Sequence, residues 1–349
     1  MSQSFLRTTR IALCAAFLVL MVVLLTWFKL TQPRVLVLHS YDQNYEWTRD
    51  IDVGLKRVLD PKLRYRVQFH YMDLKNHPDA EFRRRAAILA RHAIDAWNPN
   101  LIIAVDDDAQ KDVVMGLANK PGVSIVFAGI NGEIEPYGYN NARNVTGILE
   151  RKSLADIRRA LLAMRTVEGD KPIGRRIAHI GDRSASVQDD EKHVAAFAWS
   201  PIVLTASKLV GNFDEWKAAV HEAGENADLL LVSNYRALFR SGNAGPAVPA
   251  DEVMKWTIAN SRVPLVGMAG FFVEDGGMFA VGISGFEQGD TSARMAIRIL
   301  DHDVTPQDIP VALPRQFIIY MRKSKMAERG IALPPLYESF ARATNNFFD

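Results

Sequence analysis

Three consecutive carboxylates, Asp106, Asp107 and Asp108, directly follow the apolar stretch LIIAV at residues 101–105. Carboxylates grouped at the end of a strand could hold a divalent cation, and such a cation could support hydrolysis or phosphoryl chemistry. The same side chains could instead open a helix, where a negative charge offsets the helix dipole. A phosphate-accepting receiver domain would also need acids at the end of its first strand, but here that strand ends in His39 and Ser40.

A second group of polar and aromatic side chains follows the first apolar stretch of the soluble part, in VLVLHSYDQNYEWTRDI at residues 35–51. Ser40 could bind an anionic or polar group, and the rings of Tyr41, Tyr45 and Trp47 could cover an apolar part of a ligand. Ser40 could equally be a simple turn residue. The loop therefore predicts one edge of a binding cleft.

Polar residues also stand where the later predicted strands end. They are Asn131, Asp182, Ser184, Asn234 and Tyr235. In open parallel sheets, ligands bind in the crevice beyond the carboxyl ends of the strands. Any one of these residues could serve only as a turn or cap, but their recurrence at successive strand ends favours a cleft for a polar small molecule.

Familiar catalytic patterns do not occur in this sequence. It contains no glycine-rich dinucleotide or phosphate loop and no Gly-x-Ser-x-Gly nucleophile elbow. Its eight histidines show no metal-ligand spacing on a helix. We therefore expect a binding protein with no catalytic residue, cofactor or metal. The alternative is a metal-dependent enzyme of unknown reaction that uses Asp106, Asp107 and Asp108.

The charge of the chain is nearly balanced, at +2, and its arginine run at 83–85 falls inside a helical pattern. Such a run is typical of a solvated helix face, so we expect no nucleic-acid partner. The sole cysteine, Cys14, cannot form a disulfide within the chain and lies in an apolar run. A soluble part without cysteine suits an oxidising compartment.

Residues 11–30 are almost wholly apolar and are long enough to cross a bilayer core. Arg7 and Arg10 precede them, which predicts that residues 1–10 remain in the cytoplasm. No small-residue cleavage site follows, and Trp27 and Lys29 are typical of a membrane interface. We therefore expect an uncleaved signal anchor, with a cleaved signal peptide as the alternative.

After residue 33, apolar stretches of strand length alternate with helical patterns. Four strands and three helices precede residue 131, a segment rich in Gly, Asn and Tyr follows, and the alternation resumes at Ser153. Such alternation predicts an α/β protein with parallel sheets flanked by helices. Two units of this kind, followed by a further helix and strand, predict two lobes joined by several crossings.

Several stretches resemble known families. The segments VLVLHSYDQNYEWTRDIDVGLKRVL, LIIAVDDDA, VSIVFAGIN and NVTGILE resemble periplasmic sensing domains of bacterial membrane-bound signalling proteins. The segments VPLVGMAG, GGMFAVGISGFEQGDTSARMAIRIL and IPVALPRQFIIYMRKSKMAERGIALP resemble ABC transporter substrate-binding proteins of the tryptophan/tyrosine-binding type. The resemblance implies a two-lobed periplasmic binding protein-like fold, with lobe 1 at residues 34–130 and 281–310 and lobe 2 at 131–280 and 311–349.

The resemblance also implies where the ligand lies and which partners act. By position, the family's cleft contacts fall on Ser40, Tyr41, Trp47, Asp106, Asp107 and Asn131 of the first lobe, and on Asp182, Ser184, Asn234 and Tyr235 of the second. The expected ligand is an amino acid or similar metabolite. The expected location is the bacterial inner membrane, with a single span and the soluble part in the periplasm. Because only about ten residues precede the anchor, we expect delivery to a permease or to a separate signalling protein.

Overall fold

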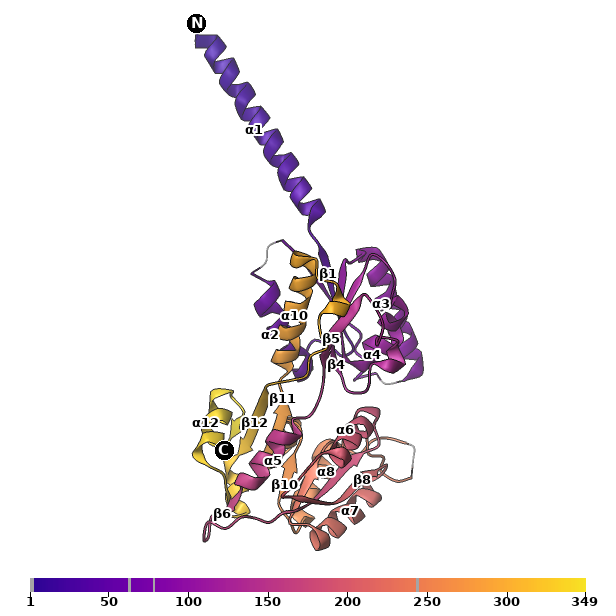
Figure 1. The fold of residues 1–349 in the computed structure, drawn as a ribbon, viewed down its shortest axis with the longest axis vertical. Helices are drawn as coiled ribbons and strands as arrows, with labels where there is room; N and C mark the ends of the chain where they lie inside the picture. The colour runs from indigo at the N-terminus through magenta and orange to yellow at the C-terminus, as the bar shows by residue number, and fades with distance from the viewer. Residues whose placement is uncertain (1–2, 62–63, 78, 243–244) are drawn as a thin grey trace.

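Two sheets, each flanked by helices, form two lobes that lie one beyond the other along the molecule (Figure 1). The structure is a computed structural model that describes residues 3–61, 64–77, 79–242 and 245–349. Residues 1–2 of the predicted cytoplasmic tail, and positions 62–63, 78 and 243–244 of the predicted lobes, lie outside this description.

Lobe 1 contains a five-stranded parallel sheet in the order β2-β1-β3-β4-β5. Its strands are β1 (Arg34–His39), β2 (Arg66–Tyr71), β3 (Leu101–Val105), β4 (Ser124–Ile130) and β5 (Val145–Leu149). Its helices are α2 (Glu46–Leu59), α3 (Ala80–Trp97), the short α4 (Asp106–Ala109) and α10 (Gly285–His302). Short π and 3-10 turns lie at Gln110–Val114, Met115–Leu117, Glu135–Tyr137 and Pro306–Asp308.

Alternate residues of β1 enter the two cores of lobe 1. Leu36 and Leu38 pack with α3 on one face, and Val35 and Val37 pack with α2 and α10 on the other. A sheet buried on both faces explains why its strands read as continuous apolar runs in the sequence.

Helices α2 and α10 approach each other through glycines. A Cβ atom at Gly289 would lie 2.0 Å from the carbonyl oxygen of Ile51, and one at Gly54 would lie 2.2 Å from that of Phe286. Neither position can carry a side chain without moving the backbone, so α2 and α10 pack with their main chains in near contact. The first turn of α2 lies beside the cavity between the lobes, so this contact helps to position the residues of that turn.

Lobe 2 contains a seven-stranded sheet in the order β14-β12-β11-β10-β9-β7-β8. Its strands are β7 (Arg176–Asp182), β8 (Val203–Val210), β9 (Leu229–Val232), β10 (Leu265–Gly267), β11 (Phe279–Ile283), β12 (Phe317–Arg322) and β14 (Phe347–Phe348), with a small ribbon of β6 (Arg165–Thr166) and β13 (Ile331–Ala332) beside it. Its helices are α5 (Leu154–Ala163), α6 (Ala185–Ala196), α7 (Phe213–Asn226), α8 (Ala250–Asn260), α9 (Phe271–Glu274), α11 (Lys323–Glu328) and α12 (Pro335–Ala343).

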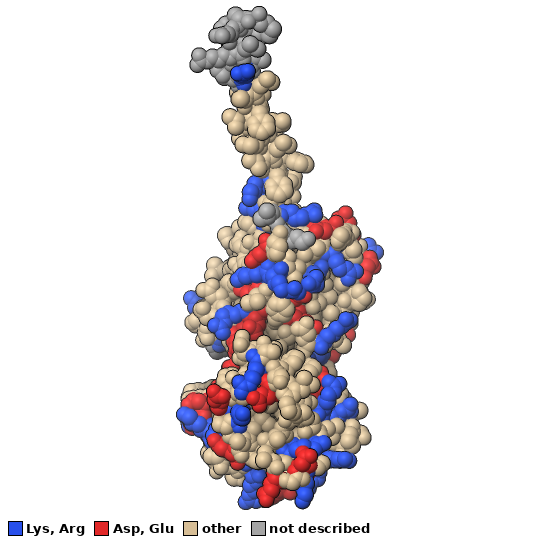
Figure 2. All heavy atoms as spheres, turned by 90° about the vertical axis from the view of Figure 1, so that its left-hand side faces the viewer, with Lys and Arg blue, Asp and Glu red and all other residues tan. Residues whose placement is uncertain are grey.

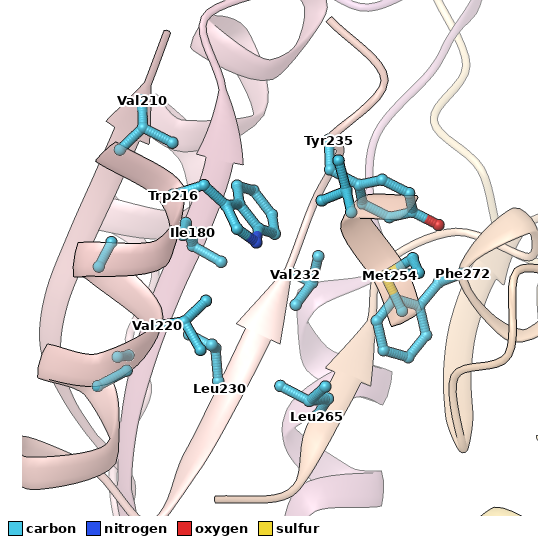
Figure 3. Close-up of a cluster of buried hydrophobic side chains, with 14 of the residues drawn as sticks. Ile180, Val210, Trp216, Val220, Leu230, Val232, Tyr235, Met254, Leu265 and Phe272 are labelled. Carbon is cyan, nitrogen blue, oxygen red and sulfur yellow. The ribbon is translucent and has the colours of Figure 1, made fainter. Parts of the chain in front are cut away.

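The core on one face of this sheet is built around Trp216 of α7, which is fully buried (Figure 3). Its ring packs against that of Tyr235 with the centroids 6.1 Å apart, and its Nε1 donates a hydrogen bond to Thr257 of α8 at 2.9 Å. Helices α7 and α8 therefore share one core with the sheet, while α5 and α12 contribute to the core on the other face.

The chain passes between the lobes after β5, between β11 and α10, and again between α10 and β12. Strand β5 belongs to the sheet of lobe 1, although the sequence prediction placed residues from 131 onward in lobe 2. Its five residues follow a long Gly- and Asn-rich segment, and pairing with β4 is what assigns them to a lobe.

Other departures from the sequence prediction concern short or irregular elements. One of the three helices predicted before residue 131 is, after β3, a short α-helix followed by π and 3-10 turns. Strand β11, helix α12 and strand β14 were not predicted, and β12 runs antiparallel to β11 within an otherwise parallel sheet. The long alternating elements of the prediction, such as the helix that is α3 (Ala80–Trp97), are confirmed.

Helix α1 (Gln3–Thr31) extends away from lobe 1 (Figure 1). Its stretch Ala12–Thr31 is, by length and composition, the one helix among the described residues that is able to cross a membrane. Figure 2 shows basic residues at both ends of an uncharged stretch of α1, which fits the positions of Arg10 and Lys29.

Candidate functional site

A cavity of about 200 Å³ lies between the two lobes, where the carboxyl ends of their strands meet. This volume is below the ~300–1,000 Å³ typical of pockets for drug-sized ligands, so it suits a small metabolite. Seven residues singled out from the sequence line it: Tyr41, Tyr45, Trp47, Asp106, Asp107, Asn131 and Asn234. The first six come from lobe 1, and Asn234 follows β9 of lobe 2.

Four other residues singled out from the sequence do not line this cavity. Ser40 is fully buried, and its hydroxyl donates to the carbonyl of Val105 at 2.7 Å and accepts from the amide of Ala109 at 2.8 Å. It therefore ties the end of β1 to the turn that carries Asp106 and Asp107.

Asp182, Ser184 and Tyr235 have comparable supporting positions in lobe 2. Asp182 is fully buried and accepts hydrogen bonds from the amides of Ser184 and Ala237, both at 3.0 Å. Tyr235 lies in the apolar core (Figure 3), and its hydroxyl donates to Asp275 at 2.7 Å. These residues hold the loops after β7 and β9, which bring Asn234 to the cavity.

Asp106 has the most constrained position in the site. Its backbone has a positive φ of 67°, and the residue is only 3 % exposed. Its Oδ1 accepts a hydrogen bond from Nε1 of Trp47 at 2.8 Å, while its buried Oδ2 has no hydrogen-bond partner among the described residues. Burial raises the pKa of Asp106 well above its usual value, and the charge of Glu150 raises it further.

The other two aspartates of this run face different partners. Asp107 accepts hydrogen bonds from the hydroxyl of Tyr137 at 2.7 Å and from the amide of Asn131 at 3.1 Å, while Asp108 pairs with Arg83. Among the residues that the structure describes, no group of three or more His, Cys, Asp or Glu side chains could hold a metal ion. The three aspartates are thus engaged by different partners.

A second group of carboxylates lines the cavity from α2 and α9. It consists of Glu46 and Asp50 of lobe 1 and Glu274 of lobe 2. Burial raises the pKa of Glu274 to about 7, with a further contribution from the charge of Glu46 and a hydrogen bond shared with it. Burial, and then Glu46, also raises the pKa of Asp50.

Three basic residues line the cavity, and two of them have acidic partners. The Nζ atom of Lys152 lies 3.3 Å from Oε1 of Glu150 and 3.8 Å from Oδ2 of Asp190. The Nη2 atom of Arg236 lies 3.0 Å from Oδ2 of Asp275. Lys75 lies over the ring of Tyr41, with 5.0 Å between its ammonium group and the ring centroid.

Sequence reasoning missed much of the cavity wall. The missed polar and aromatic residues are Glu46, Asp50, Lys75, Glu150, Lys152, Ser186, Asp190, Ser233, Arg236, Phe271, Glu274 and Tyr320. Arg236 and Phe271 follow predicted strand ends and could have been found by the same rule. Ser186, in the first turn of α6 after β7, is also within reach of that rule, whereas Asp190 lies a turn further along α6.

Comparison with known proteins agrees with this architecture. Residues 226–341 match the family model described as ABC transporter substrate binding protein. A conserved domain protein from Vibrio cholerae is 16 % identical, with 89 % of this chain and 98 % of that chain covered and a TM-score of 0.59. No curated protein matches the chain.

Two further solved structures have the same fold. The ABC domain in complex with L-Trp from Streptococcus pneumonia is 16 % identical, with coverage of 88 % of this chain and 98 % of that chain and a TM-score of 0.58. A substrate binding protein with adhesive properties from Clostridium difficile, in its ligand-free, open form, is 13 % identical, with coverage of 86 % and 96 % and a TM-score of 0.62. As the resemblance predicted, the chain has the two-lobed fold of periplasmic binding proteins, and its residues 226–341 match the ABC transporter substrate binding protein family.

Proposed function

We propose that this chain is a membrane-anchored, extracytoplasmic solute-binding protein that closes two lobes around a small molecule and releases it unchanged. The observation that carries this proposal is the cavity between the lobes, which residues of both lobes line. A ligand that contacts both lobes binds the closed arrangement more tightly, so its binding shifts the population towards closure.

The proposed ligand contacts in lobe 1 are Tyr41, Tyr45, Trp47, Asp106, Asp107 and Asn131, and Asn234 is the proposed contact in lobe 2. Ser40, Asp182, Ser184 and Tyr235 would act by positioning the loops that carry these residues. The similar ABC domain from Streptococcus pneumonia binds L-Trp, which supports an amino acid or similar metabolite as the ligand.

The proposed location is the bacterial inner membrane, with the two lobes in the periplasm and α1 as a single span. The proposed partner is an ABC permease or a separate signalling protein that receives the loaded clamp. The uncharged stretch of α1 and its basic ends support the anchoring.

A screen of small metabolites by thermal unfolding of the full chain in detergent tests the binding function. A ligand present at about 100 times its dissociation constant should stabilise the protein by about 2.7 kcal/mol. The variant Asn234→Trp, which would fill the cavity, should lose this stabilisation, whereas Asn260→Trp on the exposed end of α8 should keep it. If no compound from a broad panel stabilises the chain in a way that Asn234→Trp abolishes, the proposed function is wrong.

Fractionation of cells tests the anchor. The full chain should stay in the membrane fraction after a high-salt wash, and a reporter that is active only outside the cytoplasm should be active when fused after Asp349. The apolar length of α1 is the physical reason, since its burial in the bilayer resists salt. A shortened, soluble product would show instead that the segment is a cleaved signal peptide.

A further inference from the structure

The wall of the cavity carries many more acidic than basic groups. Seven carboxylates line it, against three basic side chains. Lys152 and Arg236 are already paired with acids, and Asp275, the partner of Arg236, is an additional carboxylate outside the lining. The site therefore holds more carboxyl groups than the described basic side chains balance, which fits the raised pKa of Asp106 and of Glu274 in the absence of a ligand.

One buried carboxylate oxygen in the cavity wall accepts no hydrogen bond from a described residue. Oδ2 of Asp106 is shielded from solvent and makes no hydrogen bond with any described residue, although the side chain lines the cavity. Asp107 and Glu150 lie close enough to act on its charge. A buried acceptor that lacks a partner is costly, so a ligand that places a positively charged donor here would gain both a hydrogen bond and charge compensation.

A second, separate group of acids in the cavity wall comes from both lobes. Glu46 of α2 and Glu274 of α9 approach each other across the cavity, with Asp50 beside them. A hydrogen bond between two carboxyl groups requires that one of them holds a proton, which relieves the repulsion between like charges. A cation placed between them would displace that proton and attract the carboxylates of both lobes.

Aromatic rings also line the cavity, beside both groups of carboxylates. They are Tyr41, Tyr45, Trp47, Phe271 and Tyr320. Ring faces attract cations and also pack against methylene groups. Two cation contacts already show this use: Lys75 lies over Tyr41 at 5.0 Å, and Arg236 lies over Phe271 at 4.4 Å.

We propose that the cavity binds a linear organic dication, an aliphatic chain with an amino group at each end. One ammonium group lies against Asp106, Asp107 and Glu150, and the other lies between Glu46, Asp50 and Glu274. This inference rests on the proposed binding function and adds the chemical class of the ligand. A zwitterion such as L-tryptophan matches this wall less well, because its carboxylate would meet the acidic excess.

Calorimetry with the full chain in detergent tests the assignment. The probes are α,ω-diaminoalkanes of three to eight carbons, 1-aminobutane, L-lysine and L-tryptophan. Affinity should peak at one diamine length, and 1-aminobutane should bind about ten- to hundredfold more weakly than the best diamine, since it makes only one of the two charged contacts. Asp106→Asn and Glu274→Gln should each weaken the best diamine by a similar factor while changing 1-aminobutane much less. Asp214→Asn, an exposed acid on α7, should leave the diamine affinity unchanged.

The outcomes separate the ligand class from the binding function. Suppose that L-tryptophan or another zwitterion binds, that Asn234→Trp abolishes this binding, and that no diamine binds. The proposed binding function then stands, and the assignment of a dication as the ligand is overturned. If diamines bind equally to the parent, Asp106→Asn and Glu274→Gln, their binding is non-specific and the assignment is also overturned. If no probe binds, the dication is overturned, and the wider metabolite screen decides the binding function. Far-UV circular dichroism of each variant must match that of the parent, and Asp107→Asn, which removes another carboxylate of the same group, replaces Asp106→Asn if the latter does not fold.

Discussion

Replacing Trp47 by alanine should weaken ligand binding by about thirtyfold, equivalent to ~2 kcal/mol, the loss typical of an aromatic residue at the centre of an interface. Trp47 lines the cavity, and its Nε1 donates the hydrogen bond that holds Oδ1 of Asp106 at 2.8 Å. The substitution therefore removes an apolar surface of the ligand site and also frees the carboxylate beside it. Calorimetry with the best ligand from the screen measures the effect.

Two control variants divide this effect into its parts. Trp47→Phe keeps most of the ring but removes the donor, so its loss in affinity should be intermediate. Trp256→Ala removes a ring of similar size that packs against Phe213 in lobe 2, outside the cavity, so it should leave affinity unchanged. Equal affinity of the parent and a correctly folded Trp47→Ala protein would show that this edge of the cavity does not contact the ligand.

The contribution of Asp190 to the stability of the ligand-free chain should fall as the pH rises from about 4 to about 6, whereas buried His179, with its pKa lowered to about 4, acts in the opposite direction. Burial raises the pKa of Asp190 from 3.8 to about 6, although the nearby charges of Lys152 and Arg151 lower it; those of Glu150 and Asp189 raise it. The folded state thus binds a proton that the unfolded state releases, so the stabilisation is complete below the unfolded pKa and is lost as the pH passes the folded one. Burial and the charge of Glu46 likewise raise the pKa of Glu274, to about 7.

Urea unfolding of the parent and Asp190→Asn across this pH range measures the effect. An upward shift of about two pKa units corresponds to about 2 to 3 kcal/mol, and the Asn variant should lack that part of the slope. Asp214→Asn, whose side chain is 72 % exposed, should keep the slope of the parent. Parallel curves for the parent and Asp190→Asn would mean that Asp190 is ionised in the folded protein.

The sequence predicted the architecture well because long elements carry strong periodicity. Strands β1, β3 and β4 are apolar throughout since both faces of their sheet are buried, and α3 has an amphipathic pattern that ends at Asn98, which has a positive φ of 46°. Short elements carry too little pattern. The five residues of β5 belong to lobe 1 only through pairing with β4, and β11 lies in a stretch that also contains glycines.

The site was predictable where it follows the ends of strands within one lobe. Asp106, Asp107 and Asn131 follow β3 and β4, so the order of strands alone brings them together. The strand-end rule does not distinguish a side chain that faces the cavity from one that faces the core, which is why it included Ser40 and Tyr235. It also cannot find residues such as Asp190, which lies beyond the first turn of α6.

The link between α1 and lobe 1 consists of Gln32 and Pro33, and β1 begins immediately after them. Two extended residues span about 7 Å, and the six residues of β1 span about 20 Å from the link to the edge of the cavity. If α1 crosses the bilayer as proposed, lobe 1 is held against the membrane surface and lobe 2 is the part that swings. A membrane-embedded partner would then detect closure by extending past lobe 1, because lobe 2 lies beyond lobe 1 on the side away from α1 (Figure 1).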